Sequence, residues 1–219
     1  MRPNFILHAL AGVLFLAYAC AAAVPPLAHS TEPEGTNPTA TAARVGVSER
    51  RLNIRAGSAV LVTGAVRPGG VQVALQIKRR GRWITVDRGR AAADGRYRLR
   101  ARLKRPTSAP ARVRVSGVAT GARKLGRLNV YRSANASWYG PGLFGRPTGC
   151  GGTLGSGQLG VAHKTLPCGT RITLRHHGRV VRVPVMDRGP YVGAREFDLT
   201  AATARRLHFS GHGSIQTTR

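Results

Sequence analysis

Only three acidic side chains occur between Ala134 and the C-terminus, and they are the first candidates for proton chemistry. They are Asp187, Glu196 and Asp198. A carboxyl group can protonate a leaving oxygen and afterwards accept a proton from an attacking hydroxyl. Arg188 follows Asp187 directly, and its guanidinium can either stabilise the ionised carboxylate or hold an anionic group of a substrate. The sequence leaves both roles of Arg188 open.

Cysteine chemistry is limited to Cys150 and Cys168 once the N-terminal segment is set aside. In a protein exported to an oxidising compartment, such a pair predicts one disulfide, and the alternative is two buried free thiols. The histidines show no spacing typical of a zinc site, and two cysteines without paired histidines make no convincing ligand set. We therefore expect no metal and no cofactor.

The N-terminus has the pattern of an export signal. Arg2 precedes an apolar run over residues 5–24, which ends in small residues followed by prolines. This pattern predicts a secretory signal peptide over residues 1–23, and a retained signal anchor is the alternative. Lipid attachment at Cys20 is not expected, because residues 17–19 match a lipobox poorly. The mature protein is predicted to be secreted or associated with the cell wall, with no integral membrane span.

Behind the signal, the composition predicts a flexible linker over residues 24–44 and then a β-rich region over residues 45–132. Short apolar or alternating runs separated by Gly and Pro turns predict strands at 58–67, 71–77, 82–88, 96–103, 111–118 and 127–131. Such spacing is typical of a β-sandwich. With the turn at residues 94–97, the region resembles the immunoglobulin-like domains of exported bacterial surface proteins, although it lacks their Cys…Trp…Cys signature.

Positive charge is concentrated in this same region. The chain carries a net charge of +27, and residues 44–132 contain 23 basic and 3 acidic residues. Arginines alternate with apolar residues at Arg96, Arg98, Arg100 and Arg102, so one strand face should carry guanidinium groups. No helix-turn-helix, zinc-finger or RNP pattern is present, and nucleic acid is not an expected partner. An anionic cell-wall polymer is the expected partner, and a merely solvated surface is the alternative; protein partners cannot be predicted.

From Ala134 onward, glycine becomes frequent and a series of short motifs appears. They occupy residues 136–142, 161–167, 168–170, 185–191 and 197–200. In this order the motifs resemble the rare lipoprotein A (RlpA) family, and more distantly the expansins and barwin-like proteins. The resemblance implies a mainly β fold, in which a six-stranded double-psi β-barrel with a short helix over residues 134–219 follows the sandwich.

The resemblance also implies a substrate, which is peptidoglycan. Several family members are lytic transglycosylases, which cleave the glycan after N-acetylmuramic acid and leave a 1,6-anhydro sugar. Asp187 lies in the motif where those members carry their acid, and His163 matches their Ala-His motif. Aromatic rings pack against sugar faces, so we expect Trp138, Tyr139 and Tyr191 to bind substrate, with core packing as the alternative. Arg188 and Asp198 are expected beside them.

Two details keep the activity open. Asp198 is also placed to cap a helix predicted over residues 200–207, a role that Thr200 can fill instead. Eleven residues before His163, where catalytic members carry glutamate, this chain has Gly152. Hydrolysis by two carboxylates is therefore in doubt, but a lytic transglycosylase attacks through the substrate's own hydroxyl and needs no activated water. The alternatives are a non-catalytic, expansin-like carbohydrate-binding module and a barwin-like defence protein.

Overall fold

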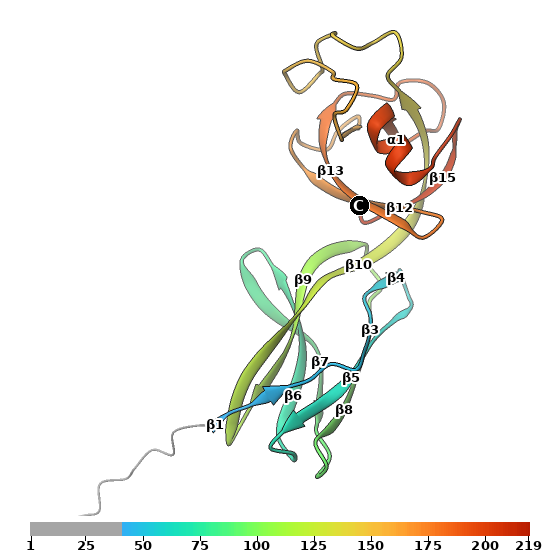
Figure 1. Cartoon of the computed structure of the whole chain (residues 1–219). Helices are drawn as coiled ribbons and strands as arrows, with labels where there is room; N and C mark the ends of the chain where they lie inside the picture. The colour runs from blue at the N-terminus through green and yellow to red at the C-terminus, as the bar shows by residue number, and fades with distance from the viewer. Residues whose placement is uncertain (1–40) are drawn as a thin grey trace, which may run out of the picture. The chain divides into compact units, whose positions relative to one another are not determined.

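The computed structural model describes residues 41–219, so the predicted signal peptide, Cys20 and most of the predicted linker lie outside the described residues. The strands are β1 (Thr41–Ala42), β2 (Arg44–Val45), β3 (Glu49–Arg51), β4 (Asn53–Arg55), β5 (Ala59–Arg67), β6 (Gln72–Arg79), β7 (Arg82–Arg90), β8 (Arg96–Arg102), β9 (Thr107–Ser116), β10 (Ala119–Tyr139), β11 (Val161–Ala162), β12 (Arg171–His176), β13 (Arg179–Asp187), β14 (Phe197–Thr200) and β15 (Gly213–Thr217); the helix is α1 (Ala201–Leu207) (Figure 1). The mainly β fold is confirmed. Within residues 41–219 no helix is long and apolar enough to cross a membrane.

The N-terminal strands form two sheets around one apolar core. In the first, β5 pairs with β2, β3 and β8; in the second, β7, β6, β9, β10 and β4 follow one another. Alternate residues of β8 are buried, among them Leu99, while its four arginines are exposed, as the alternation predicts. Pairing begins at Thr41, inside the predicted linker. The immunoglobulin-like assignment of this region stays a prediction.

The last predicted strand of this region is much longer than expected. The sequence predicts a strand over residues 127–131, but β10 extends over 21 residues. Gly126 does not end the strand: it has φ +97° and lies in a bulge, where the register with β9 shifts. Leu125 is the residue without a partner at this shift, and glycine suits the position beside it because glycine adopts positive φ without strain. As a result β10 takes part in both groups of strands (Figure 1).

The C-terminal strands close into a six-stranded barrel, as expected. The order is β14, β11, β13, β12, β15 and β10, and a parallel pairing of β10 with β14 completes the ring. Closure leaves no unpaired edge. A separate apolar core fills the barrel, including Phe197, Leu199 and Ile215. The hairpin between β12 and β13 turns at His177 and Gly178, which have φ of +42° and +83°, the signs that a tight two-residue hairpin turn requires.

The helix resolves one of the alternatives left open by the sequence. Thr200 is its N-cap, and the Thr200 hydroxyl accepts a hydrogen bond from the backbone N–H of Thr203. Arg205 and Arg206 lie in the last turn, where positive charge favours the helix dipole. Asp198 takes no part in the cap, and its carboxyl is available for another role.

Candidate functional site

A pocket of about 330 Å³ opens at one end of the barrel. Its polar floor is contributed by three strands, with Tyr139 at the end of β10, Asp187 at the end of β13 and Asp198 in β14. The loops after β10 and β13 supply the walls. The pocket therefore combines five of the residues predicted from sequence: these three, from three separate strands, and Arg188 and Tyr191 from the segment after β13.

Strand register brings the two carboxyl groups into one row. Ala162 of β11 pairs with Asp187 on one side and with Asp198 on the other, and Ser137 of β10 pairs with Asp198. Asp187 and Asp198 are thus separated by two strand spacings, or about 10 Å between backbones. Their side chains line the same pocket.

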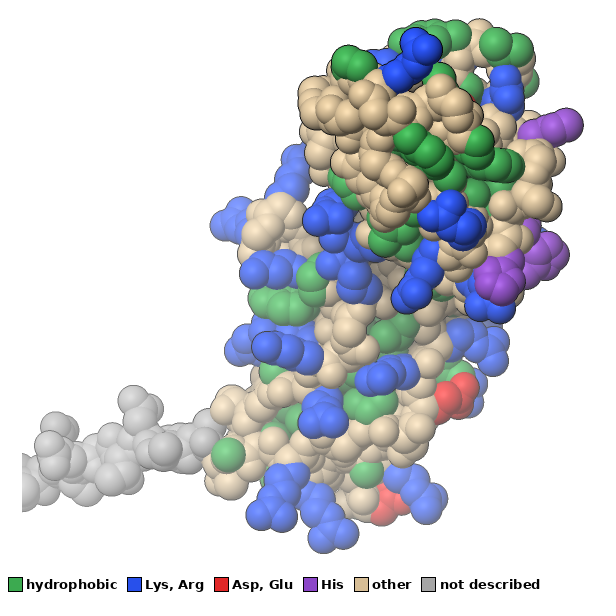
Figure 2. All heavy atoms as spheres, turned by 45° about the horizontal axis from the view of Figure 1, so that its top comes forward, with side chains coloured by type: hydrophobic (Ala, Val, Ile, Leu, Met, Phe, Trp, Pro, Cys, Tyr) green, Lys and Arg blue, Asp and Glu red, His purple; other side chains and the backbone are tan. Residues whose placement is uncertain are grey.

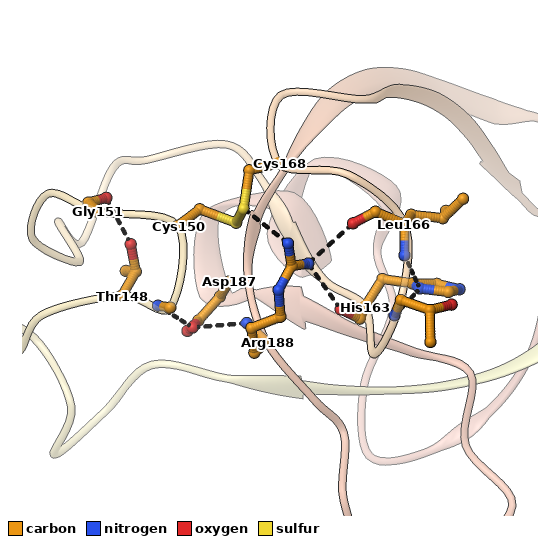
Figure 3. Close-up of a disulfide and its surroundings, with 10 residues drawn as sticks. Thr148, Cys150, Gly151, His163, Leu166, Cys168, Asp187 and Arg188 are labelled. Carbon is orange, nitrogen blue, oxygen red and sulfur yellow. Dashed lines mark hydrogen bonds between the residues drawn. A yellow bond between two sulfur atoms is a disulfide. The ribbon is translucent and has the colours of Figure 1, made fainter.

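Backbone amides hold the Asp187 carboxylate. Its Oδ1 accepts hydrogen bonds from the N–H of Gly149 at 2.6 Å and from the N–H of Arg188 at 2.8 Å (Figure 3). These two amide donors fix the position of the Asp187 carboxyl group at the end of β13. A side chain at position 149 would collide with Arg188, so glycine allows the loop to approach this closely.

Asp198 has a different environment. Burial raises the pKa of its carboxyl above the ordinary value, and the nearby charge of Asp187 raises it further. A 2.7 Å hydrogen bond from the Ser137 hydroxyl and the charge of Arg195 act in the opposite direction without cancelling the rise. Asp198 therefore keeps a proton to higher pH than an exposed aspartate does.

The Tyr139 phenol lies close to both carboxyl groups. Burial raises the pKa of Tyr139 well above its usual value, and the charges of Asp187 and Asp198 add to that rise. The hydroxyl is buried near the Asp187 carboxylate but makes no hydrogen bond of good geometry within residues 41–219. The phenol therefore packs beside the two carboxyl groups as a buried polar neighbour.

An apolar rim surrounds these polar groups. Tyr191 and Val192 are 76% and 68% exposed, and Leu143 is 41% exposed; all three line the pocket. Arg146 and Arg195 line it as well. An exposed aromatic ring beside polar groups suits the apolar face and the hydroxyls of a sugar.

Arg188 does not point its guanidinium at Asp187. It donates to the carbonyl oxygens of His163 at 3.1 Å and Leu166 at 2.9 Å, and to Sγ of Cys168 at 2.8 Å (Figure 3). Cys168 is joined to Cys150 by a disulfide, as predicted. Arg188 thus ties the loop after β11 to the end of β13, and its contact with Asp187 is made by the backbone.

His163 lies outside the pocket that contains the carboxyl groups. Its Nδ1 accepts hydrogen bonds from the N–H groups of Thr165 and Leu166, so a neutral ring carries its proton on Nε2. That nitrogen lies 3.9 Å from Glu196. Burial lowers the pKa of His163, which favours the neutral ring. Glu196 is half-buried in an ion pair with Arg132 rather than facing solvent.

Two further positions from the sequence also lie apart from the pocket. Trp138 is 38% exposed, and it is not among the residues that line the pocket. Gly152 is exposed and has φ +79°, with open space where a Cβ atom would lie. A glutamate at this position would therefore have room, but it would require a strained backbone.

Sequence reasoning missed several residues of the site. Ser137 and Arg195 affect Asp198, and Leu143, Arg146 and Val192 lie around the pocket. Ser137 had a detectable signal, because it lies two residues before Tyr139 and so on the same side of a strand. The others lie on irregular loops, where residue spacing carries no such information.

Comparison with known proteins supports the assignment of this barrel. Residues 131–218 match the family model described as lytic transglycolase. A probable endolytic peptidoglycan transglycosylase RlpA from Synechocystis is 40% identical over 43% of this chain and 33% of its own length. The Campylobacter jejuni endolytic peptidoglycan transglycosylase RlpA is 42% identical, over 36% of this chain and 30% of its own length. The Aquifex aeolicus relative is 35% identical, over 52% of this chain and 51% of its own length.

The chain thus spans about a third to a half of the length of these relatives. The solved Streptomyces papain inhibitor aligns with 41% of this chain and 94% of its own, at 22% identity and a TM-score of 0.32, too weak a likeness to bear on the fold. The family match, the motif order and the closed six-stranded ring agree with one another. The C-terminal part of this chain is therefore similar to the RlpA-like double-psi β-barrels, and its residues 131–218 match the family model of lytic transglycolases.

Proposed function

We propose that this is an exported cell-wall protein whose barrel binds peptidoglycan and cleaves its glycan strands as a lytic transglycosylase. The observation that carries the proposal is the meeting of Asp187, Asp198 and Tyr139 in one pocket with an apolar rim. The names of the relatives support the same substrate. Trp138, which lies outside the pocket, keeps at most a peripheral role in substrate binding.

The two carboxyl groups suit different steps. Asp198, whose pKa is raised by burial, donates its proton to the glycosidic oxygen as the bond from C1 of N-acetylmuramic acid breaks. The 6-hydroxyl of the same sugar then forms a bond to C1 and closes the 1,6-anhydro ring. Asp187, whose carboxyl is positioned by two amide donors, accepts the proton of that hydroxyl. No water is consumed, and solvent returns the proton from Asp187 to Asp198.

Other site residues position these groups. Ser137 orients the Asp198 carboxyl through its hydrogen bond. Tyr139 places its buried hydroxyl beside the two carboxyl groups, and the exposed Tyr191 offers a ring for a sugar face. Arg188 and the disulfide maintain the loop that approaches Asp187. In this assignment His163 is a positioning residue, because it lies outside the pocket.

Digestion of purified sacculi, with product masses recorded, tests the proposal. The wild type should release anhydromuropeptides, and Asp187→Asn and Asp198→Asn should each reduce their release by roughly 10²-fold or more, the usual loss when a general acid or base is removed. Glu196→Gln is the matched control, since it makes the same change outside the pocket. Full activity in either aspartate variant would remove that residue from the mechanism.

The second candidate is an expansin-like module that binds the wall without cutting it. The absence of a carboxylate at Gly152 favours this function. A wild type that binds sacculi but releases no anhydromuropeptides would support it. In that case, Asp187→Asn and Tyr191→Ala should still differ, because only the second removes an exposed ring from the binding surface.

A further inference from the structure

A basic hollow lies on the N-terminal region, far along the chain from the residues of the barrel pocket. It has a volume of about 530 Å³ and is lined by Arg175 of β12 and by four arginines of the N-terminal region: Arg51, Arg55, Arg98 and Arg100. All four are exposed. Among residues 41–219, no carboxylate lies within ion-pair distance of any of these four guanidinium groups. The hollow is therefore a concentration of positive charge without a matching anion in the described chain.

Strand register shows how the arginines are arranged. Leu61 of β5 pairs with Arg51 on one side and Arg100 on the other, so these two arginines flank it on one face of the sheet. Arg98 lies two residues before Arg100 along β8, at a spacing of about 6.7 Å. The arginines of β3 and β8, on either side of β5, thus form a short ladder of guanidinium groups.

The acidic residues nearby do not neutralise this ladder. Glu49 pairs across the sheet with Thr63, which pairs on its other side with Arg98, but Glu49 forms no ion pair with Arg98. Asp87 accepts a hydrogen bond from the backbone N–H of Arg100 at 2.6 Å, and not from its guanidinium. Asp94 pairs with Arg96, at the far end of β8. Lys and Arg far outnumber acidic side chains on the face in view (Figure 2).

The residue types that line the hollow indicate which class of ligand can bind there. The remaining residues of this region that line it are Asn53, Ile54, Ser58, Ala59 and Leu61, and none of them is aromatic. Proteins that hold single-stranded nucleic acids stack bases on aromatic rings, and aromatic rings also pack on sugar faces. A ligand suited to this hollow thus carries negative charges along its backbone and does not depend on stacking against aromatic side chains.

We propose that this arginine hollow binds a linear polyol-phosphate polymer, a chain of phosphodiesters without bases or stacked sugar rings. Arginine is suited to this ligand because its planar fork donates two hydrogen bonds to one phosphate. Successive phosphates along a flexible thread can then meet successive guanidinium groups along β8. The site is separate from the barrel pocket and would hold the protein on phosphate-rich wall polymer while the barrel acts on glycan.

Binding of the full-length mature chain to poly(glycerol phosphate) tests this proposal. The triple variant Arg51→Gln, Arg98→Gln, Arg100→Gln should weaken binding roughly tenfold or more. The matched control is Arg79→Gln, Arg82→Gln, Arg123→Gln, which removes the same charge from exposed positions outside the hollow. The control should change affinity less than about threefold. Equal losses in the two variants would show that net charge alone binds, and would overturn the proposal.

Two oligonucleotides of equal length, one of thymidylate and one abasic, separate the polymer class from nucleic acid. Wild-type protein should bind both with similar affinity, since the hollow offers no ring to a base. Much tighter binding of the thymidylate strand would replace the proposed ligand by a nucleic acid. With the abasic strand, the hollow variant should reduce the dependence of log K on log salt by about 2, at about 0.7 per phosphate contact. An unchanged salt slope would show that these arginines do not contact phosphate.

Failure of this proposal can be told apart from failure of the barrel's proposed activity. Cleavage of glycan strands freed of phosphate polymers should be the same in the hollow variant and in the wild type. Retention on sacculi that still carry such polymers should fall in the hollow variant alone. Retention that is equal in both would count against the hollow, whatever the outcome for cleavage.

Discussion

At the scale of single residues, the pocket gives two chemically identical side chains different environments. Asp187 accepts two amide hydrogen bonds, whereas Asp198 is half-buried and accepts one hydroxyl. Burial raises the pKa of Asp198, whereas two amide donors set the position of the Asp187 carboxyl group. The raised pKa of Asp198 and the effect of a carboxylate at position 152 can be tested by separate experiments.

The stability of Asp198→Asn should depend on pH. The pKa of Asp198 is raised in the folded protein, so the carboxyl favours folding below its unfolded value of about 3.9 and loses that contribution as pH rises through the folded value. The amide has no charge to bury. Thermal unfolding should therefore show Asp198→Asn melting above the wild type at pH 7, by on the order of a few °C, and the difference should disappear near pH 3. A variant that melts below the wild type at pH 7 would contradict the assigned environment.

Position 152 tests whether a third carboxylate is needed. Gly152 has φ +79°, so Gly152→Glu and its control Gly152→Ala should both lose stability, by about 1–3 kcal/mol. If Asp198 supplies the second carboxyl group, the glutamate variant should release anhydromuropeptides no faster than the alanine variant. A large gain specific to glutamate would locate the second carboxylate at position 152 and remove Asp198 from its proposed role.

At the scale of elements, the site depends on loops that are tied down. The disulfide between Cys150 and Cys168 closes an 18-residue separation, and Arg188 donates to its sulfur and to two carbonyl groups of the loop after β11. Strand ends alone would position the carboxyl groups, but the amide of Gly149 that contacts Asp187 comes from this tied loop. Stability of the loop and geometry of the site are therefore linked.

Reduction of the disulfide should destabilise the barrel. Closing a loop of this size is worth roughly 3 kcal/mol in the chain-entropy model. Calorimetry with and without reductant should show a lower melting temperature for the transition that includes the barrel, and lytic activity should fall with it. The double variant Cys150→Ser, Cys168→Ser in the absence of reductant is the control for effects of the reductant itself. An unchanged melting temperature would show that Arg188 and the barrel strands hold the loop without the bond.

At the scale of the whole molecule, the chain combines a basic region with a barrel that has its own core. Of the net charge of +27, the segment from Arg44 to Arg132 contributes +20, from 23 basic and 3 acidic residues. A charge of this size raises the local concentration of an anionic surface partner and weakens with salt. The protein can meet a cell-wall polymer only if it is exported, as its N-terminal sequence predicts.

The mature chain is expected to begin between Val24 and Thr31 and to carry no lipid. The reason is the exit of small residues before Val24 and the poor lipobox before Cys20. N-terminal sequencing and intact mass of protein from the culture medium measure both features. An intact Met1 in a membrane fraction, or a diacylglycerol adduct on Cys20, would contradict this prediction.

The sequence by itself determined the local features of this protein. Alternating residues predicted the exposed arginines of β8, and two cysteines in a chain with a predicted export signal predicted the disulfide. A helix cap at Asp198 or Thr200 was predicted, and the structure has it at Thr200. The motif order predicted a barrel of six strands. These features depend on a few neighbouring residues or on a recognisable pattern, so they can be read without coordinates. The length of β10 could not, because a glycine signals a turn and a bulge equally well.

Only the tertiary structure decided which side chains meet. Tyr139, Asp187 and Asp198 come together because the neighbouring strands β13, β11, β14 and β10 pair in a specific register. A shift of one residue in that register would turn each side chain to the other face of the sheet. The same register turned His163 toward Glu196 and away from the pocket. The Arg188 guanidinium donates to backbone carbonyls rather than to the Asp187 carboxylate. Contacts of this kind join residues that are distant along the chain, and their geometry depends on strand pairing and loop closure that no local pattern specifies.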